Sequence, residues 1–438
     1  MDANTTIQTV QSFLEREKDW VVDLTQRIVQ IPSVNPKFYT DPAFNREADV
    51  QAVLDRELAA IGFQTEQWDV FDDRPNLVAD IAGDESRSLI LCGHVDVVPV
   101  GDLASWTVDP FGGEIKDGKL FGRGSIDMKG GVAACVAAAR AIRQCGIELE
   151  GRLSVHAVVD EEAGGFGAMD AVRRGKLAKA VLVAEPTWGD VLPAEGGLEW
   201  ARVTFRGRTA HSAWRYNEIY PQRQGPERLE PGVNAVEIAS RFIQALRYFE
   251  LDRTRARSHP LLPVGMNTIN IGVIHGGAGL GANGLPMTMT NPAIIPDIAV
   301  IDLDMKFLPS ETSAQYRRDF ETFVYHFSQT DAWLRENPPT IQWELNGLHF
   351  PPLNTPVDHA LVKSLVNRKS AIGKTPEVKG FVAVCDAAHY AGAGVDGVIF
   401  GPSGDGFHGD DEYVDLDSLV ETTKVIAASI IDWCGVKR

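Results

Sequence analysis

The spacing of apolar residues in the first half of the chain alternates between the periods of helices and of strands. Apolar positions recur at helical spacing over 17–29, from about 47 to 61, and over 130–143. Short apolar runs typical of strands lie at 65–70, 77–81, 89–92, 152–159 and 180–184. Because alternating strands and helices form a mostly parallel sheet covered on both faces, we predict a doubly wound α/β domain.

The pattern changes after about residue 196. The predicted order becomes strand, helix, strand, strand, helix, strand, at 198–205, 233–249, 267–274, 298–307, 311–327 and 341–345. This is the order of a ferredoxin-like α+β unit. The alternating α/β pattern returns beyond Gly347, so we predict a discontinuous domain, 1–196 and 346–438, interrupted by an inserted domain, 197–345.

Composition is that of a soluble globular protein with more than one domain. The 438 residues exceed one ordinary hydrophobic core. A net charge of −18, without clusters of Lys and Arg, argues against a nucleic-acid partner. No apolar run reaches the roughly 18 residues of a membrane span. Five cysteines without a CxxC pair, and an N-terminus unlike a secretory signal, predict a reduced, cytoplasmic protein.

Acidic and imidazole side chains follow the predicted strands of the first domain. His94 and Asp96 come just after the strand at 89–92 and, two residues apart on extended backbone, share one face. Alone, such a pair is more typical of a carboxylate that orients a histidine. Similar side chains stand at other strand ends and glycine-rich turns: Asp127, Glu161, Glu162, Glu185 and His408. Because ligands bind beyond the carboxyl ends of strands in open α/β sheets, these residues together predict one site.

The residue types at these positions favour a pair of divalent metal ions. Two imidazoles and several carboxylates suit Zn²⁺, with Mn²⁺ or Co²⁺ as alternatives. Two ions about 3.5–4 Å apart would each take a histidine and a carboxylate, with a further carboxylate between them. Hydrolysis also needs a carboxylate that is not bound to metal, to move the proton of water. Adjacent Glu161 and Glu162 offer one of each role, since neighbouring side chains face different ways.

Several short motifs extend this picture along the chain. They are GHVDVVP (93–99), GRGSIDMKGG (122–131), DEEAGG (160–165), AEPT (184–187), GRTAHSA (207–213) and FHGDDEYV (407–414), with VQIPSVNP (29–36) and CDAAHY (385–390) as weaker matches. In these motifs and their order, the sequence resembles the M20 metallopeptidase family, in particular its acetylornithine deacetylase and succinyl-diaminopimelate desuccinylase branch. The resemblance spans nearly the whole chain.

The resemblance implies a role for each residue of the predicted site. The metal ligands would be His94, Asp127, Glu162, Glu185 and His408. Asp127 would bridge two zinc ions, and His94 and Glu185 would complete the first. Glu162 and His408 would complete the second. Glu161 would be the general base, and Asp96 would fix the tautomer of His94 without binding metal.

The resemblance also implies that the inserted domain is a lid and the contact surface of a homodimer. His211 would stabilise the oxyanion, usually from the second subunit, although alone it is typical of a surface-loop histidine. Asn234, Lys306 and Arg215 are the candidates for contact with substrate, with a solvated loop face as the alternative for Arg215. The family pattern is broken where Ala293 begins the run AIIP and where Lys306 replaces a common arginine.

We therefore expect a two-zinc amidohydrolase that cleaves the amide of an N-acyl amino acid or a similar small N-acyl compound. A metallo-dipeptidase or carboxypeptidase with the same centre is the alternative. A non-catalytic metal-binding relative is a third hypothesis, which the complete set of ligands and base argues against. The departures in the lid, and a long polar loop at 214–231, leave the acyl group and the amine open.

Overall fold

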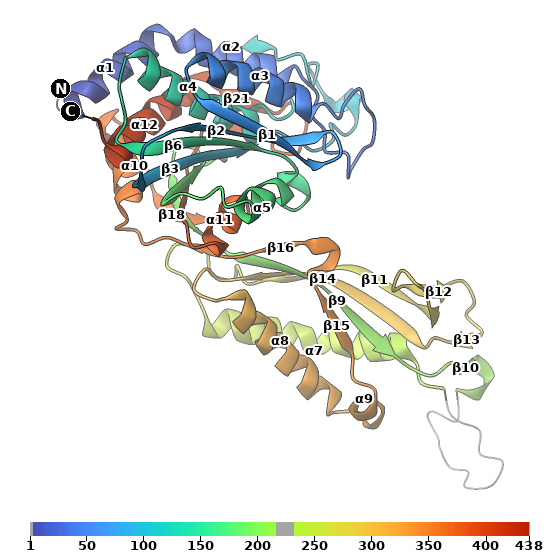
Figure 1. Cartoon of the computed structure of the whole chain (residues 1–438). Coiled ribbons are helices and arrows are strands. Elements are labelled where there is room, and N and C mark those ends of the chain that lie inside the picture. Colours follow the sequence, from blue (N-terminus) through green and yellow to red (C-terminus); the bar gives the residue numbers. More distant parts are fainter. Residues whose placement is uncertain (1–2, 216–231, 438) are drawn as a thin grey trace. The chain divides into compact units, whose positions relative to one another are not determined.

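The structure is a computed structural model that describes residues 3–215 and 232–437 (Figure 1). The predicted loop at 214–231 lies almost entirely outside the described residues. The chain forms two compact units, Met1–Glu195 with Leu353–Arg438 and Gly196–Pro352.

Strand pairing sets the boundary between the two units. β16, His349–Phe350, pairs with β9, Gly197–Arg206, so this segment belongs to the second unit. β17, Leu353–Asn354, instead pairs with β8, Val191–Glu195, in the first unit. The inserted segment therefore ends at Pro352 and not at the 345 expected from the apolar pattern.

A nine-stranded mixed sheet forms the centre of the first unit. Its order is β1-β2-β6-β3-β7-β19-β8-β17, with β18 beside β8. The central strands pair in parallel, as predicted: β6 (Gly151–Val158), β3 (Asp84–His94), β7 (Ala180–Val183) and β19 (Asp396–Ile399). Towards the edges lie β1 (Gln64–Phe71), β2 (Arg74–Ile81) and β18 (Val378–Phe381), of which β1 and β2 pair antiparallel.

Helices cover both faces of this sheet. Figure 1 shows α4 and α12 above the sheet and α5 and α11 below it. The helices of this unit are α1 (Ala3–Arg16), α2 (Lys18–Val29), α3 (Glu47–Ala60), α4 (Gly130–Gln144), α5 (Phe166–Arg173), α10 (Ala360–Ala371), α11 (Ala387–Gly392) and α12 (Leu416–Cys434). The structure thus confirms a doubly wound α/β arrangement.

One helix was missed by the sequence analysis, and another packs unusually close to the sheet. α1 was not predicted, although Ile7, Val10 and Leu14 recur at helical spacing and are buried. α4 packs closely on the sheet because Gly131 has no side chain. A Cβ at Gly131 would lie 2.0 Å from the carbonyl oxygen of Ala184, so only glycine allows this approach.

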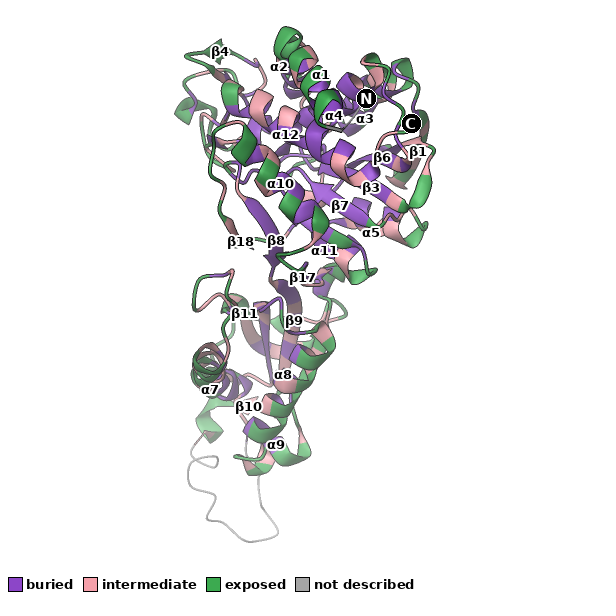
Figure 2. Cartoon of the chain, turned by 90° about the vertical axis from the view of Figure 1, so that its left-hand side faces the viewer, coloured by how far each residue is buried: buried purple, intermediate pink, exposed green. Residues whose placement is uncertain are grey.

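The strands that lead to the predicted site are buried along most of their length (Figure 2). Residues 89–92 of β3 are at most 1% exposed, and all four residues of β7 are buried. Strands that are buried on both faces of a sheet give a rigid base for the side chains at their ends. All five cysteines are free thiols. In the described part of the chain, no helix combines the length and apolar character needed to cross a membrane.

The second unit has the predicted ferredoxin-like order. Its sheet runs β12-β11-β14-β9-β15, with β16 also beside β9. α7 (Ala235–Ala256) and α8 (Ser313–Ser328) pack on the sheet through Phe205, Phe242 and Phe320. The other elements are β11 (Ile269–Leu280), β12 (Pro286–Thr288), β14 (Ile298–Phe307), β15 (Thr340–Trp343) and the short α9 (Ala332–Glu336).

Two small sheets carry segments that the motifs singled out. In the first unit, the order β20-β21-β5-β4 joins β20 (Gly404–Asp405), β21 (Tyr413–Asp415), β5 (Lys119–Phe121) and β4 (Ile115–Lys116). The FHGDDEYV segment is thereby paired with the strand that precedes GRGSIDMKGG. In the second unit, β10 (Ala210–His211) pairs with β13 (Ile294–Ile295).

The buried carboxyl of Glu195 makes the stability of the fold depend on pH. Glu195, the last residue of β8, is fully buried, and its carboxyl accepts a hydrogen bond from the Cys385 thiol at 3.1 Å. Burial raises the pKa of Glu195 to about 8. The folded protein therefore binds more protons than the unfolded chain between about pH 4.5 and 8, so this group lowers stability as pH rises.

We expect Glu195→Gln to remove this dependence. Between pH 5 and pH 8 the wild-type protein should lose up to about 4 kcal/mol of its free energy of unfolding through this group, and the variant should not show this loss. Urea unfolding curves at both pH values measure the difference. Equal pH dependence of the two proteins would contradict the prediction.

Candidate metal centre

The predicted site residues lie where neighbouring strands end at one edge of the sheet. His94 is the last residue of β3, and Glu185 lies two residues beyond β7. Glu161 and Glu162 begin the turn Glu161–Ala163 just after β6. Because β6, β3 and β7 are parallel neighbours, their carboxyl ends bring these side chains together.

Asp127 lies between the two histidines. Its Oδ1 is 3.3 Å from Nε2 of His94, and its Oδ2 is 3.3 Å from Nε2 of His408. Nε2 of His408 is also 3.1 Å from Oε2 of Glu162, and Nε2 of His94 is 3.7 Å from Oε1 of Glu185. Each histidine therefore meets a different oxygen of Asp127 and a different glutamate.

Two triplets of these residues have ligand atoms close enough to share one ion. In each triplet the atoms lie within 4.8 Å of one another: His94, Glu161 and Glu185 in one, and His94, Asp127 and Glu162 in the other. Glu161 Oε2 is 3.9 Å from Nε2 of His94. The structure thus brings all six residues together, and Glu161 lies beside the histidine that Glu185 approaches.

Asp96 supports the site in a way that differs in detail from the expected one. Nδ1 of His94 is 2.9 Å from the backbone carbonyl oxygen of Asp96 and 3.6 Å from its carboxylate. Because a carbonyl oxygen only accepts, Nδ1 donates to it, and Nε2 faces the acidic residues. Nε2 donates to Asp127 when the ring is protonated, and its lone pair is available to a metal ion when the ring is neutral. The carboxylate of Asp96 instead accepts hydrogen bonds from the backbone N–H groups of Glu161 and Glu162.

The electrostatics of the site favour added positive charge. Burial raises the pKa of Glu161, Glu162 and Glu185, and neighbouring carboxylates raise each of them further. Burial also opposes ionisation of Asp127, but hydrogen bonds from both histidines outweigh it and lower its pKa. Hydrogen bonds to Asp127 and Glu162 raise the pKa of His408 to about 10.

The raised pKa values of the glutamates show that their negative charges lack full compensation among the described side chains. Several acidic groups share one buried place, and each makes ionisation of the others harder. Divalent cations stabilise the ionised forms, and imidazole with carboxylate is the donor set that Zn²⁺, Mn²⁺ and Co²⁺ accept. The donor set therefore fits divalent metal ions.

Sequence reasoning missed two residues that hold the backbone around Asp127. The buried carboxylate of Glu412 accepts hydrogen bonds from the N–H groups of Ile126 and Asp127, and it pairs with Arg123. Lys129, also buried, donates to carbonyl oxygens at the end of α2. Both lie inside motifs quoted above, which was the signal that could have identified them.

Asp386 was missed as well. It is fully buried, and neither carboxyl oxygen has a hydrogen-bond partner among the described residues. Burial raises its pKa to about 7. It faces the turn that carries the glutamates, because a Cβ at Gly165 would lie 3.3 Å from Oδ1 of Asp386. It lies in CDAAHY (385–390), a motif to whose residues the sequence analysis assigned no role.

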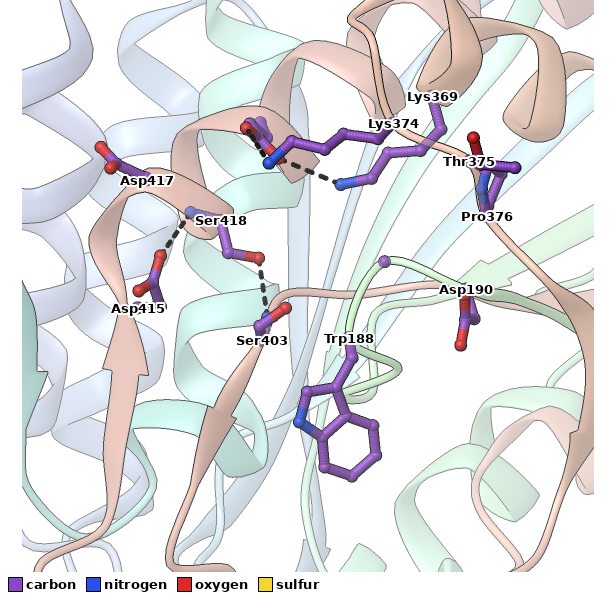
Figure 3. A pocket seen from close by; sticks show the side chains of 12 residues that line it. Trp188, Asp190, Lys369, Lys374, Thr375, Pro376, Ser403, Asp415, Asp417 and Ser418 are labelled. Carbon is purple, nitrogen blue, oxygen red and sulfur yellow. Dashed lines mark hydrogen bonds and ion pairs between the residues drawn. The ribbon is translucent and has the colours of Figure 1, made fainter.

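A cavity of about 360 Å³ lies in the first unit outside the candidate metal residues (Figure 3). Lys369 and Lys374 on its wall both pair with Glu421. Trp188, also on the wall, packs edge to face on Phe407 at 5.2 Å between ring centroids. This contact fixes the residue that precedes His408, so the cavity wall helps to place the second histidine.

The remaining predicted residues belong to the second unit. His211 is exposed, and its Nδ1 accepts a hydrogen bond from the N–H of Ala213 at 3.1 Å. Asn234 caps α7 and, with Arg215, lines a cavity of about 410 Å³. Lys306 lies on β14 and is not among the residues that line this cavity. The structure thus places Asn234 and Arg215 together and Lys306 elsewhere.

Comparisons with known proteins give a consistent result. The model of a family described as Peptidase family M20/M25/M40 matches residues 90–432. The N-formyl-4-amino-5-aminomethyl-2-methylpyrimidine deformylase of Bacillus subtilis (strain 168) is 32% identical over 445 residues, which cover 99% of both chains. The acetylornithine deacetylase of Myxococcus xanthus is 29% identical and covers 86% of this chain and 90% of its own.

A solved structure agrees at the level of the fold. Aminopeptidase PepT from Bacillus cereus superposes with a TM-score of 0.69 and 21% identity, covering 95% of this chain and 98% of its own. The family match, the full-length relatives and the cluster of candidate ligands lead to one conclusion: this chain is a hydrolase that belongs to peptidase family M20/M25/M40.

Proposed function

We propose that this protein is a two-metal amidohydrolase that removes a small acyl group from an amine, with an N-formyl aminomethylpyrimidine as the first substrate to test. The observation that carries the proposal is the position of Asp127, with one oxygen towards each histidine. The N-formyl substrate class comes from the deformylase that matches this chain over its full length.

The proposed ligands divide between two ions. His94, Glu185 and Oδ1 of Asp127 would hold one ion. His408, Glu162 and Oδ2 of Asp127 would hold the other. Zinc is our first choice, with cobalt or manganese as alternatives, because all three accept nitrogen and carboxylate oxygen.

Glu161 is the proposed general base. Divalent ions in such a site lower the pKa of water towards 7 and polarise the substrate carbonyl. Glu161 would take a proton from the attacking water as the new C–O bond forms, and would return it to the nitrogen as the C–N bond breaks. Its burial among other acids raises its pKa, which makes the carboxylate a stronger acceptor for the proton of water.

His211 is the proposed oxyanion donor. Since its Nδ1 accepts the N–H of Ala213, the proton of the neutral ring lies on Nε2. An exposed Nε2–H is suited to donate to the oxygen of a tetrahedral intermediate. We propose, with the resemblance, that His211 acts across a homodimer.

The departures in the second unit support a substrate without a carboxylate. A lysine at 306 lacks the bidentate guanidinium fork that recognises carboxylates. Arg215, which has such a fork, already pairs with Glu237. The compound in the name of the deformylase has an amino group and an N-formyl group but no carboxylate. The cytoplasmic location stays a prediction, which the five free thiols support.

Metal removal and a substrate panel test the reaction. Treatment with a chelator should abolish hydrolysis, and Zn²⁺, Co²⁺ or Mn²⁺ should restore it with about two ions bound per chain. The panel contains N-formyl aminomethylpyrimidines, N-acetyl and N-succinyl amino acids, and dipeptides. Preference for dipeptides would replace the proposal with a peptidase, and no turnover of any amide by the metal-loaded protein would refute an enzyme.

The role of Glu161 predicts a separation between catalysis and metal binding. Glu161→Gln should lower kcat by about 10²–10⁴-fold, because the water loses its proton acceptor. Metal content, measured by elemental analysis, should stay within experimental error of the wild-type value. If Glu161→Gln instead loses an ion and keeps its rate on reconstitution, Glu161 is a ligand and not the base.

Mixing two inactive variants tests action across a dimer. His211→Ala and Glu161→Ala should each be inactive. Random exchange of subunits makes half of the dimers mixed, and each mixed dimer has one complete site, so about a quarter of wild-type activity should return. No recovery after verified subunit exchange would place His211 in the same subunit's site or outside catalysis.

A further inference from the structure

The turn that carries Glu161 and Glu162 begins at a residue with an uncommon backbone conformation. Asp160 has a φ of +69°, in the left-handed region. Its carbonyl oxygen accepts the N–H of Gly165 at 2.9 Å, which closes the turn around both glutamates. Because non-glycine residues seldom adopt this conformation, surrounding contacts must hold it.

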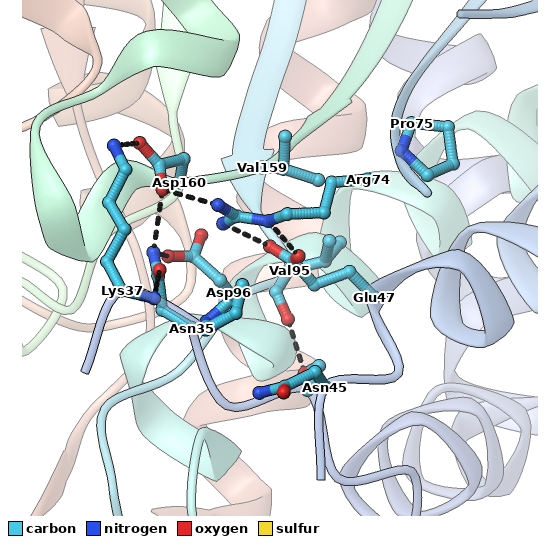
Figure 4. Close-up of polar contacts among 12 residues, drawn as sticks. Asn35, Lys37, Asn45, Glu47, Arg74, Pro75, Val95, Asp96, Val159 and Asp160 are labelled. Atoms are coloured by element: carbon cyan, nitrogen blue, oxygen red, sulfur yellow. Dashed lines mark hydrogen bonds and ion pairs between the residues drawn. The ribbon is translucent and has the colours of Figure 1, made fainter. Parts of the chain in front are cut away.

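The side chain of Asp160 supplies those contacts. It is fully buried and accepts hydrogen bonds from three residues of two other segments (Figure 4). Nη1 of Arg74 is 2.8 Å from Oδ1, Nδ2 of Asn35 is 3.0 Å from Oδ1, and Nζ of Lys37 is 2.5 Å from Oδ2. Asp160 is thus tied to the start of β2 and to the VQIPSVNP segment and its flank.

Arg74 is itself held rigidly. Its guanidinium makes a two-pronged ion pair with Glu47, the first residue of α3, at 2.5 Å and 2.9 Å. Both side chains are almost completely buried, at 8% and 1% exposed. Planar two-pronged pairing fixes the orientation of the guanidinium, so its third nitrogen points at Asp160 with little freedom.

Asn35 connects this arrangement to the other side of the turn. Its Nδ2 also donates to Oδ2 of Asp96 at 2.8 Å. The carboxylate of Asp96 in turn accepts the N–H groups of Glu161 and Glu162 at 3.0 Å and 3.3 Å. One amide group therefore links the two carboxylates that hold the start of the turn.

Opposite charges are paired within this group. Asp160 and Glu47 are acidic, and they pair with the basic side chains of Arg74 and Lys37. Lys37 is the most exposed member, at 37%, and it also lies over the rings of Phe71 and Phe166. Loss of Arg74 would leave two buried carboxylates without their main partner.

We propose that Glu47, Arg74 and Asp160 are positioning residues that aim Glu161 and Glu162, and thereby set both the affinity for the second metal ion and the rate of hydrolysis. The inference rests on the proposed roles of Glu161 and Glu162. None of the three positioning residues is a proposed ligand or touches Glu161 or Glu162 through its side chain in a described contact; each acts through the backbone of the turn.

The test compares Asp160→Asn, Arg74→Lys and Glu47→Gln with a matched control. Asp160→Asn keeps the volume but weakens the attraction to both cations, and Arg74→Lys keeps the charge but loses the fork. Glu311→Gln is the control, because Arg253 and Glu311 form an equally buried ion pair in the second unit, at 4% and 5% exposed. Lys37→Met probes the exposed edge of the group.

Three measurements distinguish a change in the orientation of Glu161 and Glu162 from a loss of stability. The affinity for Co²⁺ is measured by competition with a chelating dye, the visible absorption of bound Co²⁺ reports the geometry of its ligands, and kcat and KM are measured separately. In Asp160→Asn and Arg74→Lys we expect a 10–100-fold loss of affinity for the second ion, while the first is bound as in wild type, together with a changed Co²⁺ spectrum and a similar fall in kcat. KM should stay within twofold of wild type.

The other variants fix the interpretation. Glu47→Gln should show the same direction of change, Lys37→Met less than a threefold change, and Glu311→Gln a lower melting temperature with unchanged metal affinity, spectrum and kcat. If Asp160→Asn does not fold, Arg74→Lys carries the same test.

Wild-type Co²⁺ affinity, spectrum and kcat in folded Asp160→Asn and Arg74→Lys would overturn the proposal. A fall in stability alone, with an unchanged spectrum, would do the same. If the wild-type protein hydrolyses no amide, the proposed function fails, while Co²⁺ affinity and spectrum still decide whether these residues aim the glutamates.

Discussion

Repulsion among buried acids is the constraint on which the rest of this structure depends. The ends of β3 and β7 and the turn after β6 bring acidic side chains to one largely buried place, where water screens them only in part. The two oxygens of Asp127 divide that place between His94 and His408. Such an arrangement costs stability unless cations neutralise it, which is why a cluster that weakens the fold is a sign of function.

Polar groups around the site hold its acidic residues in place through hydrogen bonds to their backbone. Asp96 accepts the N–H groups of Glu161 and Glu162, and Glu412 accepts that of Asp127. The candidate ligands are therefore held by carboxylates that are themselves saturated with hydrogen bonds. A backbone restrained in this way loses little conformational entropy when the side chains that it carries bind an ion.

The second unit separates fold from specificity. Its ferredoxin-like core is built from aromatic contacts such as those of Phe242 with Phe205 and Phe320, which carry no chemistry. The residues that vary from the family pattern, Ala293 and Lys306, lie outside that core. A stable scaffold can thus change its substrate contacts without changing its fold, which is consistent with relatives named for different acyl groups.

The sequence by itself determined the two periodicities, and with them the parallel centre of the sheet and the inserted α+β unit, and it predicted a site of six residues at strand ends and in glycine-rich turns. It could do so because parallel strands deliver consecutive motifs to one edge. Only the tertiary structure decided which oxygen of Asp127 faces which histidine, that the carbonyl of Asp96 holds His94, and that Arg74 and Glu47 reach Asp160. Apart from the contact between His94 and Asp96, which are two residues apart, these contacts join segments far apart in the chain, whose distances no local pattern encodes.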